Sequence, residues 1–259
     1  MPSCADPSIA EGEAPARTEF GGRGSPLVIE RCTPASVSDP VAGSPVSFAE
    51  VHARMLADQG HRATGALPHD QLLLFSPDPV VTLGSGAAES DLLIPRTEYA
   101  ARGVALSTVD RGGEATYHGP GQRVGYLNVG LAEDERDLHA LLRAVEGALI
   151  DTLAQYDVIG TRVEGRTGVW VEDRKIASIG LSVRRWVTGH GFALCVDGDL
   201  APFDWIVPCG MQGCRYTTLA EETGAAIDRD LLDSRLAAHL GTHLGRKPCE
   251  PDLPKESQP

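Results

Sequence analysis

One long amphipathic helix followed by three strand-like segments is the pattern that most constrains the fold of this chain. From about Glu135, apolar residues recur at helical spacing and form one stripe: Leu138, Leu141, Leu142, Val145, Leu149 and Leu153. The segments GVWV, KIASIGLSVRRW and GFALCVDGDL follow, and the last two alternate apolar with small or polar residues. Helices interspersed with strands, several of them consecutive, predict an α/β or α+β domain with a mixed sheet flanked by helices.

The rest of the predicted domain, residues 45–249, fits the same architecture. Ser47 is suited to cap a helix through SFAEVHARMLADQ, with Glu50 as its capping-box partner. The other predicted elements are strands at Leu72–Phe75 and Val80–Leu83 joined by the turn SPDP, a short helix RTEYAARG, a strand VALSTV, and a final helix over roughly Asp228–Leu240.

Composition sets this domain apart from two tails. Residues 1–44 are rich in Ala, Pro, Gly and Ser and show no period of 2 or 3.6, so we expect a disordered N-terminal tail. Residues 250–259, EPDLPKESQP, are expected to form a disordered C-terminal tail for the same reason.

Charge and cysteine usage exclude several classes of function. The net charge of −13 argues against a nucleic-acid binder, which usually carries a basic face. No run of about 18 apolar residues and no secretory leader is present. The six cysteines form no CxxC pair, so we expect free thiols in a cytoplasmic protein.

A glycine-rich segment, RGGEATYHGPGQ, is the first candidate for a binding site. Glycine lets backbone N–H groups come close to a ligand, so Arg111 to Gln122 can form the wall of a narrow pocket. Arg111, Tyr117 and His118 would supply its polar groups. The segment is neither a Walker A loop nor a GxGxxG fingerprint, and a tight hairpin without a ligand is the alternative.

Lys175 and Cys209 are the candidates for chemistry. Lys175 begins an apolar strand on which Ser178 and Gly180 leave space for a substrate, although a solvated edge lysine is the alternative. Cys209 lies in a Pro-Cys-Gly turn, where a thiol is accessible and backbone N–H groups can face a reacting carbonyl. A free thiol needs a nearby cation or base to become a nucleophile, and Lys175 would serve if the fold brings the two together.

Zinc binding is the competing interpretation of the cysteines and histidines. The candidate ligands are Cys195, Cys209, Cys214, His118 and His190. Their spacings match no common structural zinc pattern, so no metal is expected.

Taken together, these segments resemble the lipoyl(octanoyl) transferase family, the octanoyl-acyl carrier protein:protein N-octanoyltransferases. The resemblance covers residues 46–243 and rests on RGGEATYHGPGQ, GVWVEDRKIASIG, HGFAL and PCGMQG, in the family's order. It implies the fold of the biotin and lipoate protein ligase catalytic domain and no cofactor. It also implies octanoyl transfer from acyl carrier protein to a lysine of a lipoyl domain, the first step of endogenous lipoate biosynthesis.

The resemblance also implies roles for residues of this chain. The family's catalytic cysteine, which carries the acyl thioester, falls on Cys209, and the lysine that activates it and acts as its base falls on Lys175. The acyl-binding segments fall on Arg111, Gly112, Gly113, Glu114, Ala115, Thr116, Tyr117 and His118, on Ser178, Ile179 and Gly180, and on Gly191, Phe192 and Ala193. The implied acceptors are lipoyl domains of 2-oxoacid dehydrogenase E2 subunits and the glycine cleavage H protein.

The chain departs from the family pattern at several places. Cys195 stands where the family often has Asn, SPDP replaces a His-Pro, and Cys214 places an extra thiol close to Cys209, with which it could form a disulfide. Because the carrier protein is acidic, the local basic pair Arg184 and Arg185 is a candidate docking site. An ATP-dependent lipoate–protein ligase, a non-catalytic binder of lipoyl domains or acyl carrier protein, and a cysteine thioesterase stay open as alternatives.

Overall fold

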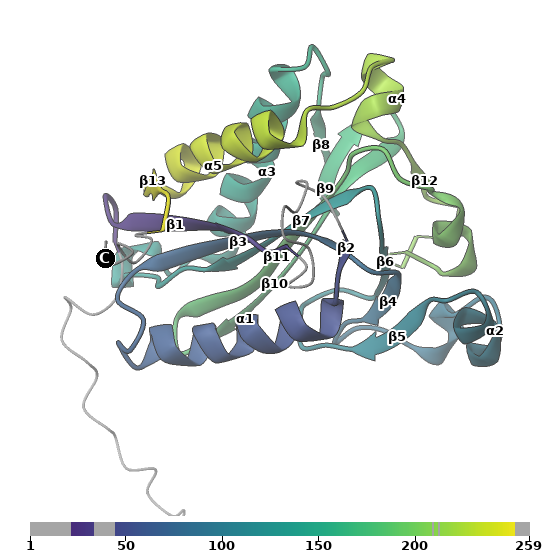
Figure 1. Ribbon diagram of the computed structural model, residues 1–259, viewed down its shortest axis with the longest axis horizontal. Helices are drawn as coiled ribbons and strands as arrows, with labels where there is room; N and C mark the ends of the chain where they lie inside the picture. The colour runs from purple at the N-terminus through teal and green to yellow at the C-terminus, as the bar shows by residue number, and fades with distance from the viewer. Residues whose placement is uncertain (1–21, 34–44, 209, 212, 252–259) are drawn as a thin grey trace, which may run out of the picture.

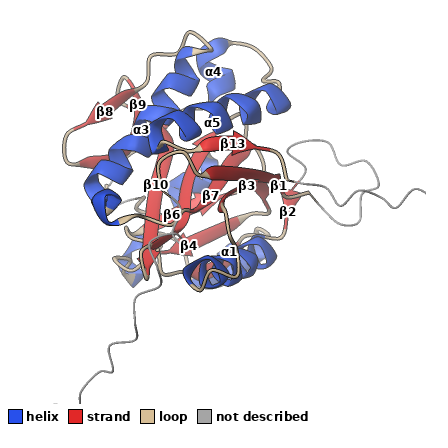
Figure 2. Cartoon of the chain, turned by 90° about the vertical axis from the view of Figure 1, so that its left-hand side faces the viewer, coloured by secondary structure: helices blue, strands red, loops and turns tan. Residues whose placement is uncertain are grey.

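A mixed ten-stranded sheet with helices on both faces is the framework of the chain (Figures 1 and 2). The computed structural model describes residues 22–33, 45–208, 210–211 and 213–251. The predicted fold class is confirmed, since parallel and antiparallel pairs occur in the same sheet.

The helices and strands follow one another in an irregular order. The α-helices are α1 (Phe48–Ala63), α2 (Arg96–Ala101), α3 (Leu138–Ala154), α4 (Leu219–Thr223) and α5 (Arg229–Leu244), and the short 3-10 turns are Glu89–Asp91, Glu133–Glu135 and Ala201–Trp205. The strands are β1 (Pro26–Arg31), β2 (Pro45–Val46), β3 (Asp70–Pro77), β4 (Val80–Leu83), β5 (Ala105–Thr108), β6 (Ala115–His118), β7 (Gln122–Asn128), β8 (Thr161–Val163), β9 (Arg166–Val171), β10 (Arg174–Arg184), β11 (Val187–Cys195), β12 (Arg215–Tyr216) and β13 (Lys247–Cys249).

The large sheet has the strand order β13-β1-β3-β7-β11-β10-β9-β8, with β2 beside β3 and β12 beside β10. The strands β5-β4-β6 form a second, three-stranded sheet. Helices α3 and α5 cover one face of the large sheet with the largest apolar cluster, and α1 covers the opposite face with a second cluster (Figures 1 and 2). The long central strands β10 and β11 therefore lie between two packed layers.

The predicted helices are confirmed, with one difference in burial. Ser47 caps α1, and its hydroxyl accepts a hydrogen bond from the backbone N–H of Glu50 (3.3 Å). Asp137 caps α3 through the backbone N–H groups of His139 and Ala140. The first residue of the predicted apolar stripe, Leu138, is 47% exposed at the N-terminal end of α3.

The prediction of an N-terminal tail over residues 1–44 is wrong for Pro26–Arg31. These residues form β1, which pairs in parallel with β3 on one side and with β13 on the other. Leu27 and Ile29 are buried in the largest core cluster. Six residues carry no usable helical or alternating signal, and only partners far away in the sequence make them a strand.

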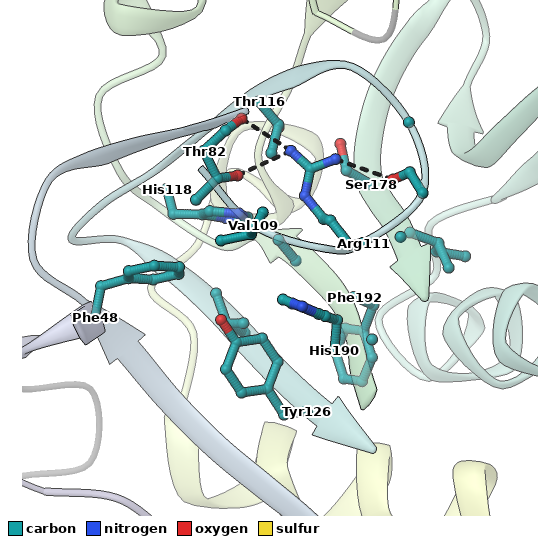
Figure 3. Close-up of a pocket in the computed structure, with 17 residues that line it drawn as sticks. Phe48, Thr82, Val109, Arg111, Thr116, His118, Tyr126, Ser178, His190 and Phe192 are labelled. Atoms are coloured by element: carbon teal, nitrogen blue, oxygen red, sulfur yellow. Dashed lines mark hydrogen bonds between the residues drawn. The ribbon is translucent and has the colours of Figure 1, made fainter. Parts of the chain in front are cut away.

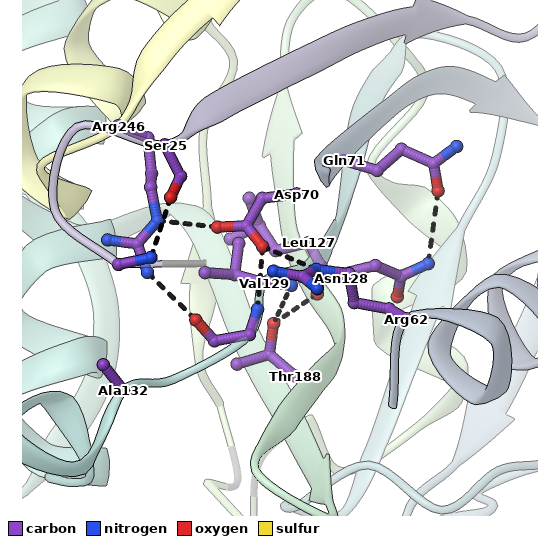
Figure 4. Close-up of polar contacts among 12 residues, drawn as sticks. Ser25, Arg62, Asp70, Gln71, Leu127, Asn128, Val129, Ala132, Thr188 and Arg246 are labelled. Atoms are coloured by element: carbon purple, nitrogen blue, oxygen red, sulfur yellow. Dashed lines mark hydrogen bonds and ion pairs between the residues drawn. The ribbon is translucent and has the colours of Figure 1, made fainter. Parts of the chain in front are cut away.

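A buried network of ion pairs stabilises the large sheet at the start of β3 (Figure 4). Asp70, fully buried at the start of β3, accepts hydrogen bonds from Arg62 (3.0 Å), Arg246 (2.6 Å) and the backbone N–H of Gly130 (2.9 Å). Arg246 also pairs with Glu135 (2.7 Å). The network thus links α1, β3, the segment before α3 and the end of α5 through groups that are all satisfied by partners.

Candidate functional site

A narrow cavity of about 50 Å³ opens where the two sheets meet, between β6, β7, β10, β11 and the first residue of α1 (Figure 3). Its lining is mostly apolar and includes Val109, Val124, Ile179, Phe192 and Ala193. An apolar slot with a few polar groups suits the tail of an acyl chain. The sequence-predicted binding segments meet here from three separate parts of the chain.

Glycine on the central strands is what allows the walls to come so close. A Cβ atom at Gly191 would lie 2.1 Å from the backbone oxygen of Gly125 on the neighbouring strand β7. A Cβ atom at Gly180 would lie 3.0 Å from Cδ of Arg111. These glycines are therefore required by close packing of the wall, and any side chain there would push the strand or the arginine away.

Arg111 holds the glycine-rich segment in place. Its Nη2 donates to the backbone oxygen of Thr82 (2.9 Å), to the Thr82 hydroxyl (2.8 Å) and to the backbone oxygen of Glu114 (2.9 Å). The backbone N–H of Gly112 donates to the oxygen of Leu181 on β10 (3.0 Å). The guanidinium thus ties the loop to β4 while its positive charge stays beside the cavity.

Two histidines of the cavity wall are neutral at physiological pH. Burial, together with the charge of Arg111, lowers the pKa of His118 to about 3, and its Nδ1 lies 3.3 Å from Oε1 of Gln122. Burial lowers the pKa of His190 to about 4 in spite of its hydrogen bond to Asp110. Neutral imidazoles keep the cavity free of charge on these two walls, which favours an apolar ligand.

His190 belongs to a side-chain cluster that could hold a metal ion. Nitrogen and oxygen atoms of His52, Asp110 and His190 all lie within 4.8 Å of one another. The carboxylate of Asp110 is already paired with His190 (2.8 Å) and Arg184 (2.9 Å), so the cluster is held together without an ion. Of the described residues that the zinc interpretation named, His190 alone belongs to this group.

Lys175 is fully buried at the start of β10, so the alternative of a solvated edge lysine is wrong. Its Nζ lies 5.6 Å from the centroid of the Trp170 ring. A Cβ atom at Gly168 of β9 would lie 2.7 Å from Cε of Lys175, and Gly168 has a φ of +125°. The buried carboxylate of Glu146 accepts a hydrogen bond from the Gly168 N–H (3.2 Å), so α3 helps to set the backbone that confines the lysine.

The predicted nucleophile, Cys209, lies outside the described residues, and so does its suggested disulfide with Cys214. The residues around it are described. Pro208 forms a parallel bridge with Ala115 of β6, and its carbonyl accepts a hydrogen bond from the N–H of Met211 (3.0 Å). The segment that carries the cysteine therefore begins beside the glycine-rich segment.

Cys195 is a second thiol in this region. Burial raises its pKa to about 12, although the charge of Lys175 acts in the opposite direction. The thiol packs in an apolar cluster with Ala115 and Tyr117.

A larger groove of about 590 Å³ continues from the cavity toward the surface. The two share Gly112, Gly113, Ile179 and Gly180. The groove is also lined by Glu114 of the glycine-rich segment, by Leu138 and Leu142 of α3, by Arg166 of β9, and by Met211. A bound chain could therefore enter the cavity along this groove.

Most of the predicted acyl-binding residues line the cavity, and three do not. Glu114 lines only the groove. The side chains of Ala115 and Tyr117 pack in the apolar cluster behind β6, so they do not line the cavity, and their assignment to the binding site stays a prediction. Alternate residues of a strand face opposite sides, so Thr116 and His118 face the cavity and their neighbours face the core.

Sequence reasoning missed part of the lining. The additional residues are Phe48, Thr82, Val109, Val124, Tyr126 and His190. His190 had a signal, because it begins the HGFAL motif, whereas the others come from unrelated segments and carry no motif.

Comparisons with known proteins agree with this geometry. Residues 53–241 match the family described as lipoyl protein ligase A/B catalytic domain. The octanoyltransferase of Novosphingobium aromaticivorans is 40% identical over 214 residues, which cover 80% of this chain and 92% of that protein. The octanoyltransferase of Flavobacterium johnsoniae is 44% identical over 69% of this chain and 79% of that protein.

Solved structures with a similar fold are lipoate–protein ligases. Lipoate-protein ligase A bound with ATP superposes with a TM-score of 0.63 at 16% identity, over 90% of each chain. A bipartite lipoate protein ligase from Thermoplasma acidophilum has a TM-score of 0.63 at 15% identity, over 90% of this chain and 88% of that one. At such low identity the likeness establishes the fold.

Proposed function

Since the chain belongs to the lipoyl protein ligase A/B catalytic domain family, we propose that it is a cysteine-dependent octanoyltransferase of lipoate biosynthesis. The donor is octanoyl-acyl carrier protein, and the acceptor is a lysine of a lipoyl domain. One observation carries the proposal. The buried Lys175 and the cavity-lining residues 178–180 lie on one strand, and Pro208, the residue before Cys209, is bridged to Ala115 of β6, the strand whose Thr116 and His118 line the same cavity.

In the first step Lys175 takes the proton of the Cys209 thiol, and the thiolate attacks the carbonyl carbon of the octanoyl thioester. The bond from Cys209 sulfur to carbon forms, and the bond from that carbon to the pantetheine sulfur breaks. The leaving pantetheine thiolate takes the proton back from Lys175. One thioester replaces another, so no ATP is needed.

In the second step the ε-amine of the acceptor lysine attacks the acyl-enzyme. A carbon–nitrogen bond forms and the bond from carbon to Cys209 sulfur breaks. The proton lost by the amine passes through Lys175 to the Cys209 thiolate, which restores the free enzyme. The product is an amide, which is more stable than the thioester and draws the reaction forward.

We expect the cavity and the groove that continues from it to recognise the acyl chain together, by burial. At roughly 0.8 kcal/mol per buried CH₂, an octanoyl chain would contribute on the order of 5 kcal/mol. The glycine-lined walls leave little room for a branched or bulky group, because added volume in a close-packed site is destabilising. Straight acyl chains are therefore the expected substrates.

Intact-protein mass spectrometry tests the proposal. Wild type incubated with octanoyl-acyl carrier protein without ATP should gain one hydroxylamine-labile octanoyl group, which a lipoyl domain then removes. Cys209→Ser should gain none, and Cys214→Ser, which removes the neighbouring thiol, should still be acylated.

Two outcomes would replace the proposal by its alternatives. Lipoylation that requires ATP would indicate a ligase like the structural neighbours, one of which has ATP bound. Release of free octanoate without an acceptor would indicate a thioesterase.

A further inference from the structure

His52 of α1 has a buried ring nitrogen without a hydrogen-bond partner. Its Nε2 is shielded from solvent, and no group in the described part of the chain pairs with it. The ring is held in place by its neighbours, because its centroid lies 5.5 Å from the ring centroid of Phe48 and 5.2 Å from that of His190. A phenyl ring would serve this packing without leaving a polar atom unsatisfied, so the nitrogen calls for a ligand.

Two further ligand groups lie beside His52, although they come from distant parts of the chain. His190 lies on β11, and Asp110 precedes Arg111. One ligand atom from each of the three residues lies within 4.8 Å of the other two, and Nε2 of His190 lies 2.8 Å from Oδ1 of Asp110. Ligand atoms bound to the same Zn²⁺ lie roughly 3–3.5 Å apart, so small side-chain movements would bring the set onto one ion.

The donor set of two imidazoles and one carboxylate suits a divalent transition metal. Zn²⁺ binds histidine nitrogen and aspartate oxygen, and three protein ligands leave one position for water. Burial lowers the pKa of both His52 and His190, so each ring offers a lone pair near pH 7. The set is therefore preorganised in position and in protonation state.

Neighbouring cations limit the affinity of such a site. Nη2 of Arg184 lies 2.9 Å from Oδ2 of Asp110, and the charge of Arg111 acts on His190. The Arg184 side chain is 62% exposed, so it can move into solvent when a cation takes the carboxylate. Asp110 is partly exposed and gives an ion a path from solvent. We expect weaker binding than at structural zinc sites, since two positive charges oppose the ion.

We propose that His52, Asp110 and His190 form a binding site for a divalent transition-metal ion such as Zn²⁺. The site joins α1, the residue before the glycine-rich segment and β11, and its ligand His190 also lines the cavity (Figure 3). A bound ion holds these three segments together and stabilises the folded chain. The site is independent of the octanoyl transfer proposed above, whose steps use no metal.

Titration of the metal-free, full-length protein with Zn²⁺ tests the site, after iodoacetamide has blocked the accessible thiols. Calorimetry should show one ion bound per chain, and the ion should raise the midpoint of thermal unfolding. His52→Phe keeps a stacked ring and removes the nitrogen. It should weaken binding by about 100-fold or more, because even outer partners of metal ligands contribute 10- to 100-fold. His61→Gln, at an exposed position of the same helix, should bind Zn²⁺ as wild type does.

A second variant and a second metal separate ligation from disturbed structure. Asp110→Asn changes a partly exposed side chain and should also lose most of the affinity. Co²⁺ bound to wild type should give visible absorption bands without a thiolate charge-transfer band, and both variants should lack these bands while their circular dichroism matches that of wild type. No uptake of Zn²⁺ by wild type, or equal affinity in wild type, His52→Phe and Asp110→Asn, would overturn the proposal.

Discussion

Replacing Gly168 by alanine tests whether the confinement of Lys175 matters for catalysis. The new Cβ would lie 2.5 Å from the backbone oxygen of Ala177 and 2.7 Å from Cε of Lys175. Real Cβ atoms do not approach so closely, so the β9–β10 pair must separate or the lysine must move. Glycine also permits the φ of +125° at this position, which other residues rarely adopt.

The expected cost has two parts. An unfavourable backbone conformation costs about 1–3 kcal/mol, and overpacking costs about 1–3 kcal/mol. Together these lower the free energy of unfolding by roughly 2–6 kcal/mol, which urea unfolding can measure. A displacement of the lysine by about 1 Å would slow the chemical step by roughly 100-fold.

A matched control separates backbone strain from the effect on the lysine. Gly103, after α2, has a φ of +72°, and nothing lies within 4 Å of a Cβ added there. Gly103→Ala should therefore lose about 1–2 kcal/mol of stability and keep the wild-type acylation rate. Single-turnover acylation of both variants is measured well below their unfolding midpoints. If Gly168→Ala acylates as fast as Gly103→Ala, the position of Lys175 is not what Gly168 provides.

Three further outcomes follow from the structure. Asp70→Asn should lower the free energy of unfolding by about 3–5 kcal/mol, because Arg62 and Arg246 then share no buried carboxylate; an unchanged urea midpoint would contradict this. The pKa of His118 is lowered from 6.5 to about 3 in the folded state, so the unfolded chain binds the proton first, and stability is lost as the pH falls from about 6.5 toward 3. As the pH falls through that window, the free energy of unfolding of wild type should drop by up to about 1.4 kcal/mol per pH unit more than that of His118→Gln. Parallel stability curves for the two proteins would refute the assignment. Arg185→Glu, at an exposed position, should raise KM for the carrier-borne donor and leave octanoyl-pantetheine unaffected; equal effects on both donors would rule out docking at this arginine.

The charge of Arg184 is less available for a docking contact than the sequence alone indicated. It pairs with Asp110 at 2.9 Å, so its charge is locally compensated. Arg185 is exposed beside Trp186, whose ring stacks on Arg136 (4.6 Å). The prediction of a basic docking site at Arg184 and Arg185 stays a prediction, and Arg185 is the member of the pair that it mainly concerns.

The sequence by itself determined much of the architecture of this protein. The apolar period of α3 and the alternation in β10 and β11 follow from local geometry, so they can be recognised without a structure. The glycine-containing motifs indicated most of the residues that line the cavity, because glycine permits close approach of backbone segments.

Only the tertiary structure decided which side chains meet. The register of β6 on β4 places Thr116 and His118 in the cavity and Ala115 and Tyr117 in the core, and Phe48 reaches the same cavity from α1. Strand β1 exists because β3 and β13, far away in the sequence, supply its hydrogen bonds. The burial of Lys175 likewise depends on Gly168 and Trp170 of a neighbouring strand. Periodicity is a property of neighbours along the chain, whereas pairing, burial and side-chain clusters depend on partners that only folding brings into contact.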